Sequence, residues 1–209
     1  MNPGRLPTLI RKAFASSVAL GLLLQLSTAS TSARDEVSKF QRKLVEVVPG
    51  KIYRGVQPGD EEDYEYLRRI GIKTELNLRK YLWWQEHHLH NRAEAEGFVY
   101  RHDGMPTLWN EPKDQEVEEA LADLIDPALQ PIYVFCRLGK DRTGMLIALY
   151  RVLYQQWSGC RAYQEWKSFG FKAWNDGLKD YFEKRLRRES AITGYDPNFS
   201  VNRCDGTQN

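Results

Sequence analysis

Residues 131–144 read PIYVFCRLGKDRTG, and the predicted fold is organised around this segment. Its first part, residues 132–135, is β-branched and aromatic, which is the composition of a buried strand. After Gly144 the sequence MLIALYRVLYQQW is apolar without a breaker and predicts a partly buried helix. Cys136 is therefore expected at the carboxyl end of a strand, in a loop that leads into a helix. Unpaired backbone N–H groups and the helix dipole converge at such a point, so the geometry favours anion binding.

The residue types in this loop suit attack of sulfur on a phosphomonoester. Cys136 and Arg142 form a C-x5-R pattern, followed by Thr143 and Gly144. Cysteine attacks as the thiolate, which nearby cations and a helix N-terminus favour. The planar fork of Arg142 can hold two phosphoryl oxygens and the charge of the transition state. Gly139 and Gly144 allow close approach of the backbone to the anion, and Thr143 is placed to donate a hydrogen bond to the thiolate.

The sequence CRLGKDRTG resembles the signature loop of the cysteine-dependent phosphatases, the protein-tyrosine and dual-specificity superfamily. The chain around it resembles the small bacterial and plant/fungal atypical dual-specificity group. The supporting stretches are IYRGVQP at residues 52–58, GIKTELNLR at 71–79 and GF at 170–171, so that the resemblance spans residues 47–186. It implies a dual-specificity-phosphatase-like fold and phosphomonoester hydrolysis through a phosphocysteine intermediate. The family usually has His before the cysteine, where this chain has Phe135, and the change removes hydrogen bonds that tune the loop.

Two other interpretations of the loop stay open at this point. Cysteine is often buried and inert, so Cys136 alone would fit a structural role in a turn. A catalytically inactive phosphate-binding or partner-docking module would use the same loop. The co-occurrence of Cys136, Gly139, Arg142, Thr143 and Gly144 favours the phosphatase interpretation.

The first 33 residues have the pattern of a secretory signal peptide. A basic start with Arg5, Arg11 and Lys12 precedes an apolar core at residues 13–26, which is too short for a comfortable membrane span. Small residues follow, with cleavage expected after Ala29 or Ala33. An uncleaved anchor or a transit peptide are the alternatives. The pattern predicts export to the periplasm or secretion, with no membrane span in the mature protein.

The remaining chain is long enough for one domain with a substantial core. We expect a phosphatase domain at residues 34–188 and a loosely ordered tail at 189–209, which is rich in turn-forming residues. Loss of Arg5, Arg11 and Lys12 takes the formal net charge from +2 to −1. A nucleic-acid binder would need a clustered basic face, so no nucleic-acid partner is expected.

The chain has three cysteines, Cys136, Cys160 and Cys204. An oxidising compartment puts free thiols at risk. One arrangement pairs Cys160 with Cys204 and leaves Cys136 free, and the other leaves all three thiols unpaired.

Helix-type and strand-type patterns alternate along the chain. Strands are expected at residues 52–54, 73–78, 98–100 and 132–135, and helices at 60–70, 81–96, 114–125, 159–169 and 174–186. This order predicts an α/β fold with a central, mainly parallel sheet flanked by helices. Cations at the end of the last helix, among them Lys184 and Arg188, are expected to be solvated.

The mechanism needs an acid for the departing oxygen. Asp103 follows a predicted strand, is expected in a Gly/Pro-bearing loop, and resembles the Asp-x-x-Pro arrangement of phosphoinositide phosphatases of this superfamily. Asp141 inside the signature loop is the alternative, since some lipid-directed relatives carry Asp there. Asp114 starts a predicted helix and is the weaker choice. An ordinary turn aspartate is the competing interpretation of Asp103.

The loop also bears on the substrate. The residues expected to bind phosphate are Arg137, Leu138, Gly139, Lys140, Asp141 and Gly144. Extra cations favour polyanionic substrates, and Lys140 to Gly144 resembles loops of phosphatases acting on inositol phosphates or phosphoinositides. Phosphotyrosine and other phosphoproteins remain alternatives, as does a solvent-facing role for Arg137 and Lys140. No metal or organic cofactor is expected because sulfur supplies the nucleophile, and the EHHLH cluster at residues 86–90 lacks metal-ligand spacing.

Overall fold

The computed structural model describes residues 38–80, 83–106, 109–172, 176–193 and 196–206. The predicted signal peptide, residues 1–33, lies outside these ranges. None of the described helices combines the length and apolarity needed to cross a bilayer.

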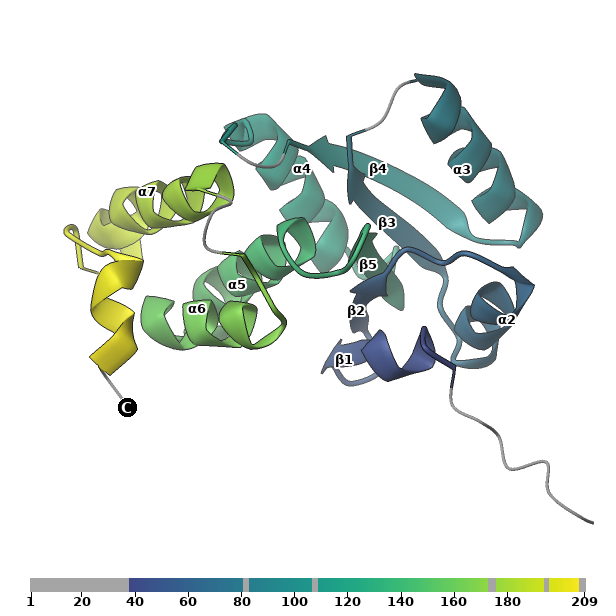
Figure 1. The fold of residues 1–209 in the computed structure, drawn as a ribbon, viewed down its shortest axis with the longest axis horizontal. Helices are drawn as coiled ribbons and strands as arrows, with labels where there is room; N and C mark the ends of the chain where they lie inside the picture. The colour runs from purple at the N-terminus through teal and green to yellow at the C-terminus, as the bar shows by residue number, and fades with distance from the viewer. Residues whose placement is uncertain (1–37, 81–82, 107–108, 173–175, 194–195, 207–209) are drawn as a thin grey trace, which may run out of the picture. The chain divides into compact units, whose positions relative to one another are not determined.

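A five-stranded sheet forms the centre of the fold (Figure 1). The strands are β1 (Val45–Val48), β2 (Ile52–Val56), β3 (Thr74–Arg79), β4 (Val99–Met105) and β5 (Ile132–Cys136), in the order β1-β2-β5-β3-β4. Only β1 pairs antiparallel, with β2, and the other pairings are parallel. The prediction of a mainly parallel sheet is confirmed, and the strand that carries Cys136 is its middle strand.

Helices cover both faces of the sheet (Figure 1). One face packs against α2 (Glu61–Arg69) and α3 (Trp83–Ala95), and the other against α4 (Asp114–Ile125) and α5 (Arg142–Gln155). The helices α6 (Gly159–Ser168) and α7 (Asp176–Thr193) pack on α5, and short 3-10 helices lie at η1 (Gln41–Lys43) and η2 (Val201–Gly206). All six helices expected from the sequence, including the one after Gly144, are present, with ends shifted by a few residues at most except for α7, which continues to Thr193.

Local chemistry explains where α2 begins and ends. The Asp60 carboxylate accepts a hydrogen bond from the Asp63 N–H, which caps the helix, and Glu61 and Glu62 add negative charge to its first turn. Gly71 follows the helix with φ +81°, the left-handed conformation that favours glycine.

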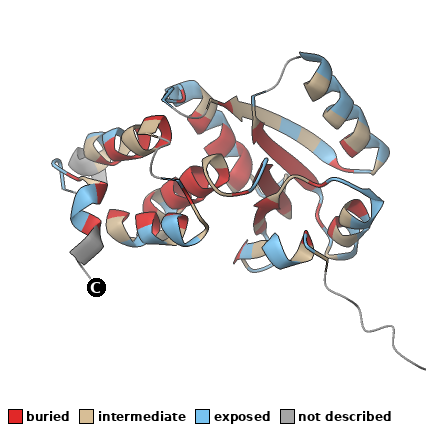
Figure 2. Cartoon of the chain, viewed as in Figure 1, coloured by how far each residue is buried: buried red, intermediate tan, exposed pale blue. Residues whose placement is uncertain are grey.

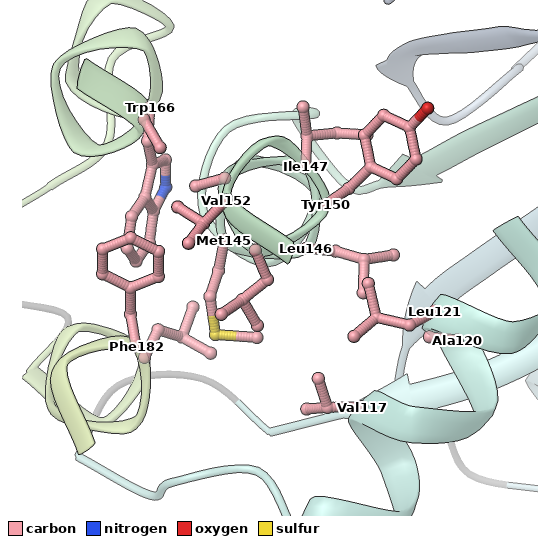
Figure 3. Close-up of a cluster of buried hydrophobic side chains, with 14 of the residues drawn as sticks. Val117, Ala120, Leu121, Met145, Leu146, Ile147, Tyr150, Val152, Trp166 and Phe182 are labelled. Atoms are coloured by element: carbon pink, nitrogen blue, oxygen red, sulfur yellow. The ribbon is translucent and has the colours of Figure 1, made fainter. Parts of the chain in front are cut away.

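The helix α5 is the centre of the larger core. Figure 3 shows it between Trp166 and Phe182 of α6 and α7 on one side and Val117 and Leu121 of α4 on the other. Most residues of its first three turns are buried, and Figure 2 shows the same helix and the middle strands as the most buried part of the fold. A helix apolar on all sides is buried on all sides. The helix that follows Cys136 therefore begins at a fixed position relative to the sheet.

The second core lies under α2 and α3 and contains a buried carboxyl group. Glu75 of β3 is 1% exposed, beside Tyr133 of the neighbouring strand. Burial and the charge of Glu96 raise the pKa of Glu75 to about 8. At neutral pH the Glu75 side chain is therefore mainly protonated.

Contacts near the carboxyl end of the chain add to the sequence-based expectations. The Lys184 and Arg188 side chains are 55% and 51% exposed, in line with the expected solvated position, and they also form ion pairs with Glu111 and Asp114 on the segment leading into α4. The tail expected to be loosely ordered contains η2, in which Cys204 is buried. Cys204 forms a disulfide with Cys160 across a Cα–Cα distance of 5.0 Å. The cross-link and the burial explain why composition alone misjudged this segment.

Candidate active site

Cys136 is the last residue of β5 and is 3% exposed. Its strand lies between β2 and β3, and Val56 is its partner on β2. The helix α5 begins at Arg142. We call residues 136–142 the signature loop. It joins the carboxyl end of the middle strand to the N-terminus of a buried helix, as predicted, and Cys136 is the free cysteine while the other two are bonded to each other.

The middle of the signature loop lies directly on β2. Gly139 has φ +67°, and a Cβ built there would be 2.3 Å from the carbonyl oxygen of Gly55. A side chain at Gly139 would therefore collide with backbone. The Gly139 carbonyl accepts a hydrogen bond of 2.7 Å from Nη2 of Arg54, a residue that is 2% exposed.

The end of the signature loop is held by α6. Trp166 donates a 3.1 Å hydrogen bond from Nε1 to the Lys140 carbonyl, which also accepts from the Gly144 N–H at 3.1 Å. A Cβ on Gly144 would lie 2.1 Å from Trp166 Cδ1. The Gly144 N–H is thus used in a hydrogen bond of the first helical turn, and the absence of a side chain at Gly144 leaves space for the Trp166 indole. This differs from the phosphate-binding role expected of Gly144.

Thr143 and Arg142 occupy the first turn of α5. The Thr143 hydroxyl oxygen is buried and has no hydrogen-bond partner within the described part of the chain. The Arg142 guanidinium is half-buried and donates from Nη1 to the Met105 carbonyl at 3.3 Å. Arg142 therefore connects the signature loop to the end of β4.

Asp103 lies within β4, not in the loop that we expected to begin there. The strand continues to Met105, which pairs with Arg79 after an irregularity in the register. Glycine and proline close to Asp103 suggested a loop, but pairing with β3 extends the strand through them.

Asp103 and Cys136 lie on the same face of the sheet, near the carboxyl ends of the parallel strands β4 and β5. Arg101 pairs with Leu76, which pairs with Val134, so these three side chains share a face. Cys136 is two residues beyond Val134, and side chains two residues apart in a regular strand share a face. Asp103 is two residues beyond Arg101, where the register of β4 shifts, and the charges of Asp123 and Glu119 on α4 act on its carboxyl group, so Asp103 also lies on the face covered by α4. Two strand spacings, roughly 10 Å of backbone, separate them. A bound phosphate ester fits across such a gap.

The Asp103 carboxyl has the electrostatics of a proton donor. Burial and, to a smaller degree, the negative charge of Asp123 raise its pKa to about 6, against the opposing effect of Arg101. Its Oδ2 atom is buried without a hydrogen-bond partner among the described residues. A carboxyl that keeps its proton up to nearly neutral pH is suited to general acid chemistry.

The other two candidate acids are engaged elsewhere. Asp141 is at the N-cap position of α5, and its Oδ1 accepts from the Lys172 N–H at 3.3 Å. Asp114 accepts hydrogen bonds from Arg188 and Tyr181. The Arg188 contact is the main cause that lowers the pKa of Asp114 to about 2. Asp114 is therefore ionised at any relevant pH.

The remaining predicted phosphate-binding side chains differ in exposure. Arg137 is exposed and Leu138 is 51% exposed. The Lys140 side chain is half-buried, with Nζ beside Gly170, where an added Cβ would be 3.1 Å away. Lys140 therefore lies along the α6–α7 connection instead of extending into solvent.

Phe135 is on the opposite face of the sheet from Cys136. It is 1% exposed and stacks on Tyr133 at a centroid distance of 5.7 Å, within the core under α2 and α3. An apolar ring suits this position. The loop contacts that the absent His would make must come from other residues.

The sequence did not point to Arg54 and Trp166, although both bond to signature-loop carbonyls. An arginine between apolar residues of a predicted strand was the available signal for Arg54. No comparable signal marked Trp166, which is one of several aromatic residues in its region.

No cluster of three or more metal-ligating side chains occurs among the described residues. In the EHHLH segment, Glu86 instead pairs with His102 of β4 at 2.6 Å, and His90 pairs with Glu94 at 3.1 Å.

Comparison with known proteins agrees with this geometry. The profile described as "Tyrosine phosphatase family" matches residues 41–193 of the 209-residue chain. The chain belongs to the tyrosine phosphatase family and is a cysteine-dependent phosphatase of the α/β, dual-specificity type.

The relatives with named activities include tyrosine-protein phosphatases, inositol diphosphatases and a dual specificity protein phosphatase. The probable tyrosine-protein phosphatase DG1060 of Dictyostelium discoideum is 28% identical over 146 residues, covering 67% of this chain and 86% of that protein. Inositol diphosphatase SIW14 of Saccharomyces cerevisiae is 33% identical over 129 residues, covering 59% of this chain and 44% of that protein. The crystal structure of the SIW14 core catalytic domain with citrate has a TM-score of 0.56 and 27% identity, covering 74% of this chain and 94% of that one.

Proposed function

We propose that the protein hydrolyses phosphomonoesters through a phosphocysteine intermediate. Sulfur of Cys136 attacks phosphorus, and the bond from phosphorus to the leaving oxygen breaks as Asp103 gives that oxygen a proton. Water, deprotonated by Asp103, then attacks the phosphocysteine and releases phosphate and the Cys136 thiolate. The observation that carries this proposal is the position of Cys136 between a strand end and the helix that begins with Arg142.

The other residues bind and stabilise the phosphoryl group in this proposal. The guanidinium of Arg142 and the backbone N–H groups of residues 137–141 hold its oxygens, and their charge favours the transition state. The buried hydroxyl of Thr143 donates to the thiolate as it forms and leaves. Among the candidate acids, geometry and electrostatics favour Asp103 over Asp141.

The proposed substrates are phosphoproteins or inositol phosphates. Support comes from relatives named as tyrosine-protein phosphatases and inositol diphosphatases. Arg137 and Lys140 add positive charge to the signature loop, and such charge attracts polyanions. Comparison of phosphotyrosine peptides, inositol phosphates and phosphoinositides in a phosphate-release screen identifies the class. For a polyanionic substrate, Arg137→Ala and Lys140→Ala raise KM more than they do for phenyl phosphate.

We further propose that the protein is exported and cleaved after Ala29 or Ala33, on the basis of the N-terminal sequence pattern. N-terminal sequencing of the protein recovered from the periplasm or medium tests this. Recovery of uncleaved protein with the cell membrane would contradict it.

The test of the catalytic proposal is phosphate release from phenyl phosphate with EDTA present. The wild-type protein should turn over, and Cys136→Ser should abolish turnover without lowering the melting temperature substantially. The matched control is Cys160→Ser with Cys204→Ser, which removes the other two cysteines and should retain activity. Full activity in Cys136→Ser would contradict the assignment of the nucleophile.

A further inference from the structure

Arg54 is a buried cation directly beneath the signature loop. It lies on β2 next to Gly55 and opposite Val134, on the sheet face that also carries Cys136. Its side chain is 2% exposed, and its guanidinium carbon is 3.9 Å from the centroid of the Phe169 ring. The ring holds the guanidinium plane in one orientation.

The charge of Arg54 has no adjacent counter-ion. Within the described residues no carboxylate lies within ion-pair distance of Arg54, and its Nη1 is buried without a hydrogen-bond partner. The carboxylate whose charge acts on Arg54 is that of Glu165, which forms its own ion pair with Arg151. Burial lowers the pKa of Arg54 to about 10, so the group stays charged at neutral pH. A buried, unpaired charge is costly unless an anion compensates it. The nearby Cys136 site is where such an anion would bind.

The hydrogen bond from Arg54 also fixes the direction of a loop amide. Nη2 donates to the Gly139 carbonyl from the protein interior. In a planar trans peptide the C=O and the following N–H point in opposite directions. The Lys140 N–H is therefore turned outward, toward the open side of the loop, and it makes no hydrogen bond within the described residues.

Trp166 acts in the same way on the next peptide. Its indole N–H bonds from the interior to the Lys140 carbonyl at 3.1 Å, which turns the Asp141 N–H outward. Two consecutive amides then face the same side, an arrangement that binds anions. Both orientations depend on side chains outside the loop.

We infer that Arg54 is a positioning residue of this active site, which holds the Gly139–Lys140 peptide with the Lys140 N–H toward the phosphoryl group and adds positive charge behind it. It supplies loop support from β2, whereas the usual His position holds the packed ring of Phe135. This inference rests on the proposed function and specifies how the phosphoryl-binding site is built.

The experiment compares Arg54→Met, Arg54→Lys and the control Arg187→Met. Arg187 also donates to a backbone carbonyl, that of Phe199 at 2.9 Å, but it lies on α7 away from the loop. Each variant is titrated calorimetrically with inorganic phosphate, its kcat and KM for phenyl phosphate are measured, and its melting temperature is recorded.

Arg54→Met should bind phosphate at least about tenfold more weakly and lose about tenfold to hundredfold in kcat. Arg54→Lys keeps the positive charge but loses the planar guanidinium fork, so its phosphate affinity should lie between those of the wild-type protein and Arg54→Met. Arg187→Met should lose stability without weakening phosphate binding. Wild-type phosphate affinity and kcat in Arg54→Met, with only a lower melting temperature, would overturn the inference.

If Arg54→Met does not fold, Arg54→Lys decides the question, because unchanged phosphate affinity in a folded Lys variant would contradict the positioning role. The outcome is separable from the proposed function. Absence of turnover in the wild-type protein removes the proposed function, while the phosphate titration still reports on the role of Arg54.

Discussion

The first prediction concerns the pH dependence that Asp103 imposes on turnover. Its pKa is raised to about 6, mainly by burial. As the general acid it must be protonated, so activity is retained below that pKa and lost above it. The protonated fraction is about nine tenths at pH 5 and about one tenth at pH 7. The ratio kcat/KM should therefore fall by about tenfold per pH unit above pH 6.

Replacing the carboxyl group removes this dependence. Asp103→Asn should lower kcat for phenyl phosphate by about 10²- to 10⁴-fold and flatten the alkaline limb of the profile. The loss should be smaller for p-nitrophenyl phosphate, because its leaving group departs without a proton. The assay is initial-rate phosphate release from pH 4.5 to 8 at constant ionic strength, with Asp141→Asn as the matched variant. A limb that persists in Asp103→Asn and disappears in Asp141→Asn would refute the assignment.

Three further predictions concern stability. The pKa of Glu75 is about 8 in the folded protein against an ordinary 4.5, so the native state holds a proton that the unfolded chain releases, and the protein loses stability as pH rises between those values. Glu75→Gln should therefore raise the unfolding free energy by about 3 kcal/mol at pH 7 and by much less at pH 5. Equal effects at both pH values would contradict this. The Cys160–Cys204 disulfide spans a sequence separation of 44, and its removal by Cys160→Ser with Cys204→Ser should lower the unfolding free energy by about 4 kcal/mol in urea titrations, whereas an unchanged midpoint would contradict a structural role. Gly139→Ala places a Cβ 2.3 Å from the Gly55 oxygen at positive φ and should cost at least about 2 kcal/mol, measured by the same titration against Gly59→Ala, where the added atom would be 3.6 Å from its nearest neighbour.

Local composition was sufficient to predict the elements that carry the nucleophile. The acid-rich start and apolar stripe of residues 114–125 predicted α4 with its observed ends. The apolar run before Cys136 and the unbroken apolar run after Gly144 predicted β5 and α5. In each case the signal comes from residues adjacent in sequence, where periodicity reports directly on burial.

The contacts that complete the site join residues far apart in sequence, and for that reason the sequence did not reveal them. Arg54 bonds to a carbonyl 85 residues away, and Arg142 to a carbonyl 37 residues away. The extension of β4 through Asp103 depends on pairing with β3, which outweighs the local turn preference of Gly104. Propensity describes the local chain, whereas these outcomes depend on tertiary contacts.

The central claim is that Cys136 carries the phosphoryl group during turnover, and direct trapping tests it. The protein is mixed with phenyl phosphate, quenched in acid within the first turnover, and analysed by intact mass and peptide mass spectrometry. The account predicts a single added phosphoryl group on the peptide containing Cys136, with a larger trapped fraction in Asp103→Asn, because hydrolysis of the intermediate is slowed. Phosphate release at the wild-type rate with no phosphorylated cysteine in either protein, or with the label on another residue, would contradict it.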